Sequence, residues 1–135
     1  MTRTDPLASP LAKARLAAVI VWLYGRVRWL LWRRTIPEAA ATLRAWRGPV
    51  PAAAPTRLGR TVERVLAVGP YRARCLHTSF VHFALLRSRG EEPELVIGLP
   101  ERPATKDAHA WVEIDGTDVG PPPGRGQHVE LARYR

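Results

Sequence analysis

The sequence predicts an α+β fold, in which a helix carrying the only cysteine packs on a small antiparallel sheet. Up to Gly90, apolar residues recur with helical spacing, and Gly-Pro pairs at 48–49 and 69–70 interrupt the pattern. Beyond Gly90, short apolar segments alternate like strands, and Asp115-Gly116 is typical of a two-residue hairpin turn. Helices therefore come first along the chain and strands follow.

Four helices are expected in the first two thirds of the chain, over residues 11–33, 36–46, 57–68 and 75–89. Thr56 is the expected cap of the third helix, and Gly90 is a good stop for the fourth. On the fourth helix, Leu76, Phe80 and Phe83 are predicted to form one apolar side. Residues 1–10 are expected to be a frayed tail.

Two strands are expected over residues 94–100 and 108–114, and the Asp115-Gly116 turn leads to a short return strand at 117–120. Residues 121–126, PPPGRG, break regular structure. For residues 127–135 the pattern leaves two alternatives, a last short element or a loose tail.

The chain is expected to divide into an N-terminal helical, Arg- and Trp-rich region with a linker, residues 1–55, and a core, residues 56–135. The proline-rich segment GPVPAAAP at 48–55 places this boundary. The formal net charge is +9, and residues 1–49 hold nine Arg or Lys and two Asp or Glu, a net +7. Such a region attracts an acidic peptide, a membrane surface or nucleic acid. No nucleic-acid motif accompanies the charge, so no nucleic-acid partner is expected.

The tryptophans of the first helix, Trp22, Trp29 and Trp32, alternate with arginines. They are expected to pack on the core or on a partner protein, and contact of this helix with a membrane surface is the alternative. The apolar stretch 16–24 is too short to span a bilayer, and no secretory signal is evident. Together with an unpaired thiol, this favours the cytoplasm.

Cys75 is the only cysteine, which excludes an intramolecular disulfide and any multi-cysteine metal site. No cofactor and no metal are expected. A thiol is nucleophilic as thiolate, and the start of a helix and a nearby imidazole both favour that form. Cys75 is therefore a candidate nucleophile if a histidine reaches it.

Of the four histidines, His109 is the best candidate base, because it begins the strand expected to lie in the sheet under the Cys75 helix. His77 points to the opposite side of that helix, and His82 lies about 10 Å along its axis. His128 stays open, since nothing in the sequence fixes its position. A structural role for His109 is the alternative to catalysis.

The strings around these residues resemble a known family. They are RCL at 74–76, LLRSRG at 85–90, ELVIG at 94–98 and AHAWVEIDG at 108–116. They look like the transglutaminase-like leader peptidases of lasso-peptide biosynthesis, a branch of the superfamily that shares its order of Cys helix and His strand with papain-like enzymes. The resemblance is strong from about residue 70 to 120 and weaker upstream.

The resemblance implies a cysteine peptidase that removes the leader from a ribosomally made precursor peptide, with Cys75 as nucleophile and His109 as general base and acid. It also implies a separate leader-recognition protein as partner and a macrolactam cyclase that uses ATP downstream. The family has an aspartate about twelve residues after the histidine, where this chain has Pro121-Pro122-Pro123. Asp118, Asp107 and Glu130 are weak substitutes. A catalytically weak or inactive scaffold that binds the precursor or partner enzymes is therefore the alternative function.

Overall fold

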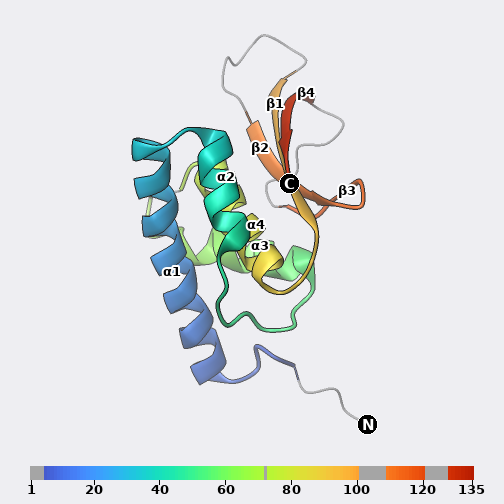
Figure 1. Cartoon of the computed structure of the whole chain (residues 1–135). Coiled ribbons are helices and arrows are strands. Elements are labelled where there is room, and N and C mark those ends of the chain that lie inside the picture. Colours follow the sequence, from blue (N-terminus) through green and yellow to red (C-terminus); the bar gives the residue numbers. More distant parts are fainter. Residues whose placement is uncertain (1–4, 72, 101–108, 121–127) are drawn as a thin grey trace.

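The computed structural model describes residues 5–71, 73–100, 109–120 and 128–135. Over these residues the chain forms four helices and four strands, which are α1 (Pro10–Arg33), α2 (Ile36–Ala45), α3 (Pro55–Val65), α4 (Cys75–Ser88), β1 (Pro93–Pro100), β2 (His109–Ile114), β3 (Thr117–Asp118) and β4 (His128–Tyr134). Figure 1 shows the helices grouped on one side of the molecule and the strands on the other. The predicted α+β class is confirmed.

The four strands form one antiparallel sheet in the order β3-β2-β1-β4. Asp115 and Gly116 both have positive φ, 50° and 77°, and form the predicted hairpin turn. β3 pairs Asp118 with Glu113, as the two-residue turn predicts. Residues 128–134, which the sequence left open between an element and a tail, form β4 along the other edge of β1.

α4 is the central element and contacts α1, α2, α3, β1 and β2. Every residue from Thr78 to Leu86 is buried, including Phe80 and Phe83. Burial therefore extends round this helix beyond the side predicted from Leu76, Phe80 and Phe83. Because neighbouring elements cover it all round, its polar residues Ser79 and His82 are buried as well.

The N-terminal helices dock on the rest of the chain through leucine-rich faces. On α1 the buried residues recur every three or four positions, at Leu16, Ile20, Leu23, Val27 and Leu30. They join one hydrophobic cluster with residues of α4 and of the sheet, so packing is continuous across residues 55 and 56, where the sequence places a boundary. The tryptophans of α1 lie on its outward side and are not part of this core. The expectation that they pack on the core is therefore wrong, and a partner protein or a membrane surface stays as the alternative.

The start of α3 differs from the prediction. The helix begins at Pro55 with Ala54 as its N-cap, and Thr56 does not cap it. Proline fits the first helical position because its fixed φ suits the helix. A backbone N–H at that position would have no acceptor within the helix, so nothing is lost by its absence. α3 ends at Val65, three residues before the predicted end.

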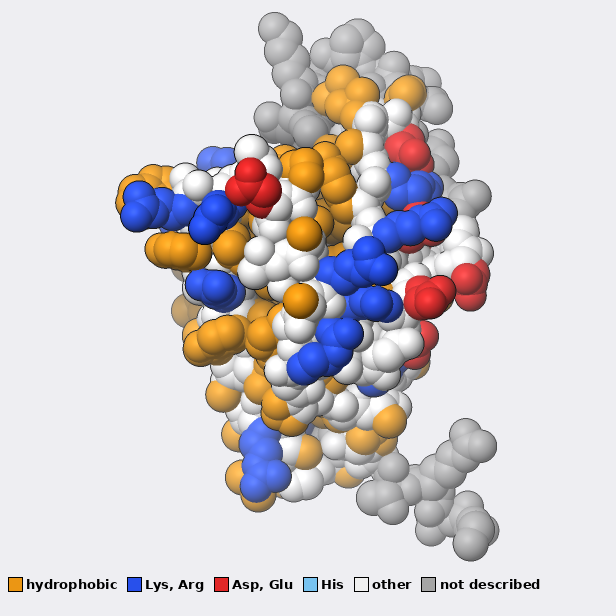
Figure 2. All heavy atoms as spheres, viewed as in Figure 1, with side chains coloured by type: hydrophobic (Ala, Val, Ile, Leu, Met, Phe, Trp, Pro, Cys, Tyr) orange, Lys and Arg blue, Asp and Glu red, His pale blue; other side chains and the backbone are white. Residues whose placement is uncertain are grey.

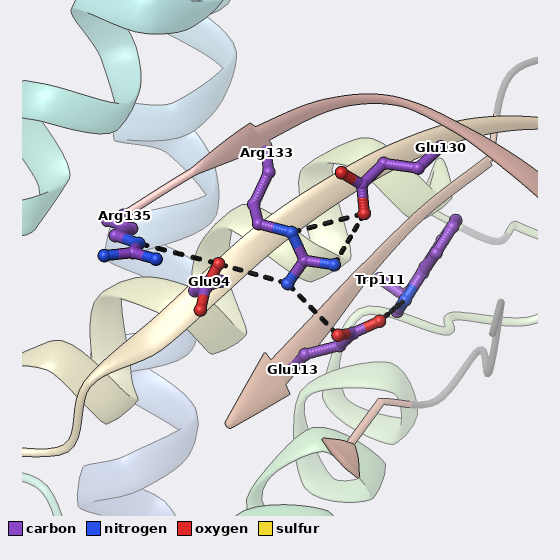
Figure 3. A network of polar contacts seen from close by, with 6 residues as sticks. All are labelled: Glu94, Trp111, Glu113, Glu130, Arg133 and Arg135. Atoms are coloured by element: carbon purple, nitrogen blue, oxygen red, sulfur yellow. Dashed lines mark hydrogen bonds and ion pairs between the residues drawn. The ribbon is translucent and has the colours of Figure 1, made fainter. Parts of the chain in front are cut away.

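A network of charged side chains lies on one face of the sheet (Figure 3). The buried carboxylate of Glu113 accepts hydrogen bonds from Trp111 Nε1 at 2.7 Å and from an Arg133 nitrogen at 3.1 Å. Arg133 also pairs with Glu94 at 3.1 Å and with Glu130 at 2.5 Å. Arg133 therefore ties β4 to its neighbour β1 through Glu94 and to β2, the next strand of the sheet, through Glu113.

Replacing Arg133 with methionine is expected to destabilise the protein, because it removes the guanidinium that pairs with the buried carboxylate of Glu113. We expect a loss of about 2 kcal/mol in the free energy of unfolding, less than for a fully buried pair because Arg133 is partly exposed. Urea unfolding measures it. Arg135→Met is the matched control, since its side chain is 79% exposed and 3.7 Å from Glu94, and should cost under about 0.5 kcal/mol. Equal effects of the two substitutions would contradict the role of Arg133.

Candidate active site

Cys75 is the first residue of α4 and is half-buried. The N-cap residue is Arg74, whose side chain makes no capping hydrogen bond. The first N–H groups of a helix have no acceptor within the helix, and its dipole is positive there. The start of α4 therefore presents N–H donors and partial positive charge to the sulfur, and to any carbonyl oxygen bound beside it.

Two residues of α4, Cys75 and Ser79, hold the backbone of Ala110 on β2. Ser79 Oγ donates a hydrogen bond to the Ala110 carbonyl oxygen at 2.9 Å, and the Ala110 N–H donates to the Cys75 sulfur. The two residues are four positions apart, so they share one face of the helix. This pair of contacts fixes the start of α4 at the level of His109 and Ala110.

The imidazole of His109 hydrogen-bonds the Cys75 thiol, so the structure brings together the two residues that the sequence singled out. This hydrogen bond is the largest cause of a lowered pKa of Cys75. Burial acts in the opposite direction, and the N–H groups of Ala110 and Leu76 add to the lowering. The result is a thiol that ionises more readily than a free cysteine.

His109 is supported by Trp111, two residues further along β2. Their rings stack with centroids 5.9 Å apart and planes inclined by 24°. The indole nitrogen is held in turn by Glu113, and Glu113 by Arg133 (Figure 3). Sequence reasoning did not assign roles to Trp111, Glu113 and Arg133. The alternating pattern of AHAWVE could have indicated that Trp111 and Glu113 lie beside His109, because residues 109, 111 and 113 lie on one face of a strand.

The other histidines are placed elsewhere. The ring of His77 meets that of Tyr24 on α1 edge-on, with centroids 5.9 Å apart. His82 is buried and donates from Nε2 to the Pro55 carbonyl oxygen at 2.7 Å, and burial lowers its pKa to about 4, so it is neutral near pH 7. His128 lies on β4, where its backbone pairs with Pro100.

Of the three acids considered as substitutes for the missing aspartate, Asp118 and Glu130 lie among the described residues. Asp118 lies opposite Glu113 on β3, and its Oδ1 accepts a hydrogen bond from the Gly120 N–H at 3.0 Å. Glu130 is paired with Arg133, and both Glu130 and His109 lie opposite Gly98, so they are two strands apart, about 10 Å. Asp107 and Pro121-Pro122-Pro123 lie outside the described residues.

Two other kinds of site are not found in the part of the chain that the structure describes. There is no group of three His, Cys, Asp or Glu side chains that could hold a metal ion. None of the helices described combines the length and the apolar character needed to cross a membrane.

The comparisons with known proteins agree with this geometry at the level of a superfamily. The family described as "Transglutaminase-like superfamily" matches residues 17–132, a range that begins within α1, ends within β4 and includes every element between them. Neither the curated proteins nor the solved structures yield a significant match. The chain belongs to the transglutaminase-like superfamily.

Proposed function

We propose that this protein is a cysteine peptidase that removes the leader from a lasso-type precursor peptide, with Cys75 as nucleophile and His109 as general base and acid. The observation that supports catalysis most directly is the hydrogen bond between His109 and a thiol of lowered pKa. The choice of substrate rests on the resemblance of the strings at 74–76, 85–90, 94–98 and 108–116.

The reaction begins when the Cys75 thiolate attacks the carbonyl carbon of the peptide bond, while His109 holds the thiol proton. The oxygen that becomes negative is stabilised by N–H groups at the start of α4. His109 then donates the proton to the leaving amine, and the C–N bond breaks. Water, deprotonated by His109, hydrolyses the thioester and releases the leader with a free carboxylate.

The proposed partners are a separate leader-recognition protein, which supplies the precursor, and an ATP-dependent macrolactam cyclase that uses the product. Both follow from the family resemblance. Genes for a precursor peptide, a small leader-binding protein and an asparagine-synthetase-like cyclase beside this gene would support this assignment.

Leader release tests the proposed reaction. The protein, the recognition protein and the precursor are mixed, and the products are followed by mass spectrometry. Cys75→Ala is expected to lower the rate by at least about a thousand-fold, since it removes the nucleophile. His109→Ala is expected to lower it by about 10²–10⁴-fold. The control is His77→Ala, which changes a histidine on the same helix that faces α1. Cleavage by Cys75→Ala at the parent rate would refute the catalytic role.

A scaffold that binds the precursor or partner enzymes is the second candidate, and the proline run at 121–123 favours it. The reactivity of Cys75 towards iodoacetamide at graded pH separates the two. For an enzyme, His109→Ala should shift the reactivity profile to higher pH, because the largest cause of the lowered pKa is removed. His77→Ala should leave the profile in place. A profile that matches a free thiol and does not respond to His109→Ala would favour the scaffold.

A further inference from the structure

The outer surface of α1 and α2 carries a groove with two hollows. The first, about 380 Å³, is lined by Ala18, Val19 and Trp22 on α1 and by residues 46–49 after α2. The second, also about 380 Å³, is lined by Arg26, Trp29 and Leu30 on α1, by Arg34 just after it, and by residues of α2. Both hollows lie along α1, the first against the segment that follows α2 and the second against α2 itself, and we call them together the α1–α2 groove.

Helical spacing places the two hollows next to each other along α1. Trp22, Arg26 and Trp29 follow one another at intervals of four and three residues, so they lie on one face of α1. Thr42 of the second hollow and Trp46 of the first are four residues apart. The centres of the hollows are separated by about ten residues of α1, or ~15 Å.

The walls of the groove are aromatic and exposed. Trp22 is 56% exposed and Trp29 is 43% exposed, although Trp22 also stacks on Trp46 with centroids 6.3 Å apart. A Cβ atom on Gly48 would lie 2.4 Å from the Trp46 ring. Glycine at position 48 is therefore what allows this ring to lie against the chain. Exposed aromatic surface with a polar rim is typical of an interaction site.

The charge of the groove selects the partner. Residues 10–49 contain eight Lys or Arg and a single acid, Glu38. Arg26 and Arg47 have no acidic partner among the described residues, and the guanidinium of Arg26 lies over the Trp29 ring at 5.0 Å. Figure 2 shows hydrophobic and basic side chains gathered over α1 and α2. A partner that fits this surface carries negative charge beside its apolar contacts.

The shape of the groove favours a protein segment over a membrane. A bilayer is broad and flat, whereas each hollow is a separate space of about 380 Å³ beside α1 that is large enough for an individual side chain. Residues on one side of a helix and eleven positions apart are separated by about 16 Å, which matches the spacing of the hollows. A second copy of this chain is disfavoured by its net charge of +9.

We propose that the α1–α2 groove binds an acidic, amphipathic helical segment of a partner protein, which inserts one apolar side chain into each hollow. Trp22 and Trp29 are the anchors on this chain, and Arg26 and Arg47 contact the acidic residues of the segment. This interaction is independent of the reaction proposed above, since it involves neither Cys75 nor His109.

Selection from a phage-displayed library of random 16-residue peptides tests the proposal, with the full chain as target. The enriched peptides are expected to be acidic and to carry two large apolar residues about eleven positions apart. Failure to enrich peptides, or enrichment of neutral or basic ones, would overturn it. A fluorescein-labelled synthetic copy of the leading peptide then gives the Kd by anisotropy.

Variants locate the binding site of that peptide. Trp22→Ala and Trp29→Ala are each expected to raise the Kd at least about ten-fold, as central aromatic anchors do. Trp32→Ala is the matched control, because Trp32 is 76% exposed on the same helix and lines neither hollow, and its Kd should not change. Circular dichroism melting checks that all three variants fold. Equal Kd values for the parent and the Trp22 and Trp29 variants would overturn the proposal.

Further measurements separate the alternative occupants. A peptide with its Asp and Glu replaced by Lys should not bind, and Cys75→Ala should bind the acidic peptide as the parent does, even if no peptidase activity is found. Flotation with phosphatidylcholine vesicles containing phosphatidylglycerol tests a membrane, and sedimentation equilibrium tests self-association. Vesicle binding or dimerisation that depends on Trp22 and Trp29 would assign the groove to that occupant and refute a peptide partner.

Discussion

The position of Cys75 depends on the burial of α4. From Thr78 to Leu86 the helix is enclosed by the other helices and by β1 and β2, so it cannot rotate or slide without opening the core. The nucleophile lies at the edge of that core, on the first turn. The contact of Ser79 with the Ala110 carbonyl oxygen transmits the fixed position of the helix to the strand that carries His109. The N-terminal helices therefore contribute to the site although they are remote from it, because they cover the side of α4 that faces away from the sheet.

The ionisation of the thiol is decided by opposing effects. Burial disfavours the thiolate, whereas the imidazole of His109 and the N–H groups of Ala110 and Leu76 favour it, and the net effect is a lowered pKa. A half-buried position suits the thiol, because full burial would disfavour the thiolate more strongly and would keep a peptide bond from reaching the sulfur. These donors come from α4 and from the start of β2. These groups lie together around the sulfur because α4 packs on the sheet.

The residues that were predictable from the sequence carry local signals. Cys75 follows a Gly-Pro break and begins an apolar helical run, and Asp115-Gly116 specifies its own turn through two residues with positive φ. β4 was left open, because its contacts are not local: its pairing with β1 joins residues as far apart as Leu95 and Tyr134, and the bond from Arg133 to Glu113 joins residues 20 positions apart. The enclosure of α4 is non-local as well. Helical spacing reports one buried face, and it cannot report a helix covered on all sides.

The support of His109 illustrates how the sheet and the site are linked. In many triad enzymes a third side chain, Asp, Glu or Asn, orients the imidazole, and at the position where the leader peptidases that this sequence resembles have an aspartate, this chain has prolines. On β2, the flat indole of Trp111 stacks on the His109 ring. An indole restrains a ring only if it is itself held, and here Glu113 accepts its N–H while Arg133 holds Glu113 from β4. The strand that the sequence left uncertain therefore completes the chain of contacts that ends at the imidazole.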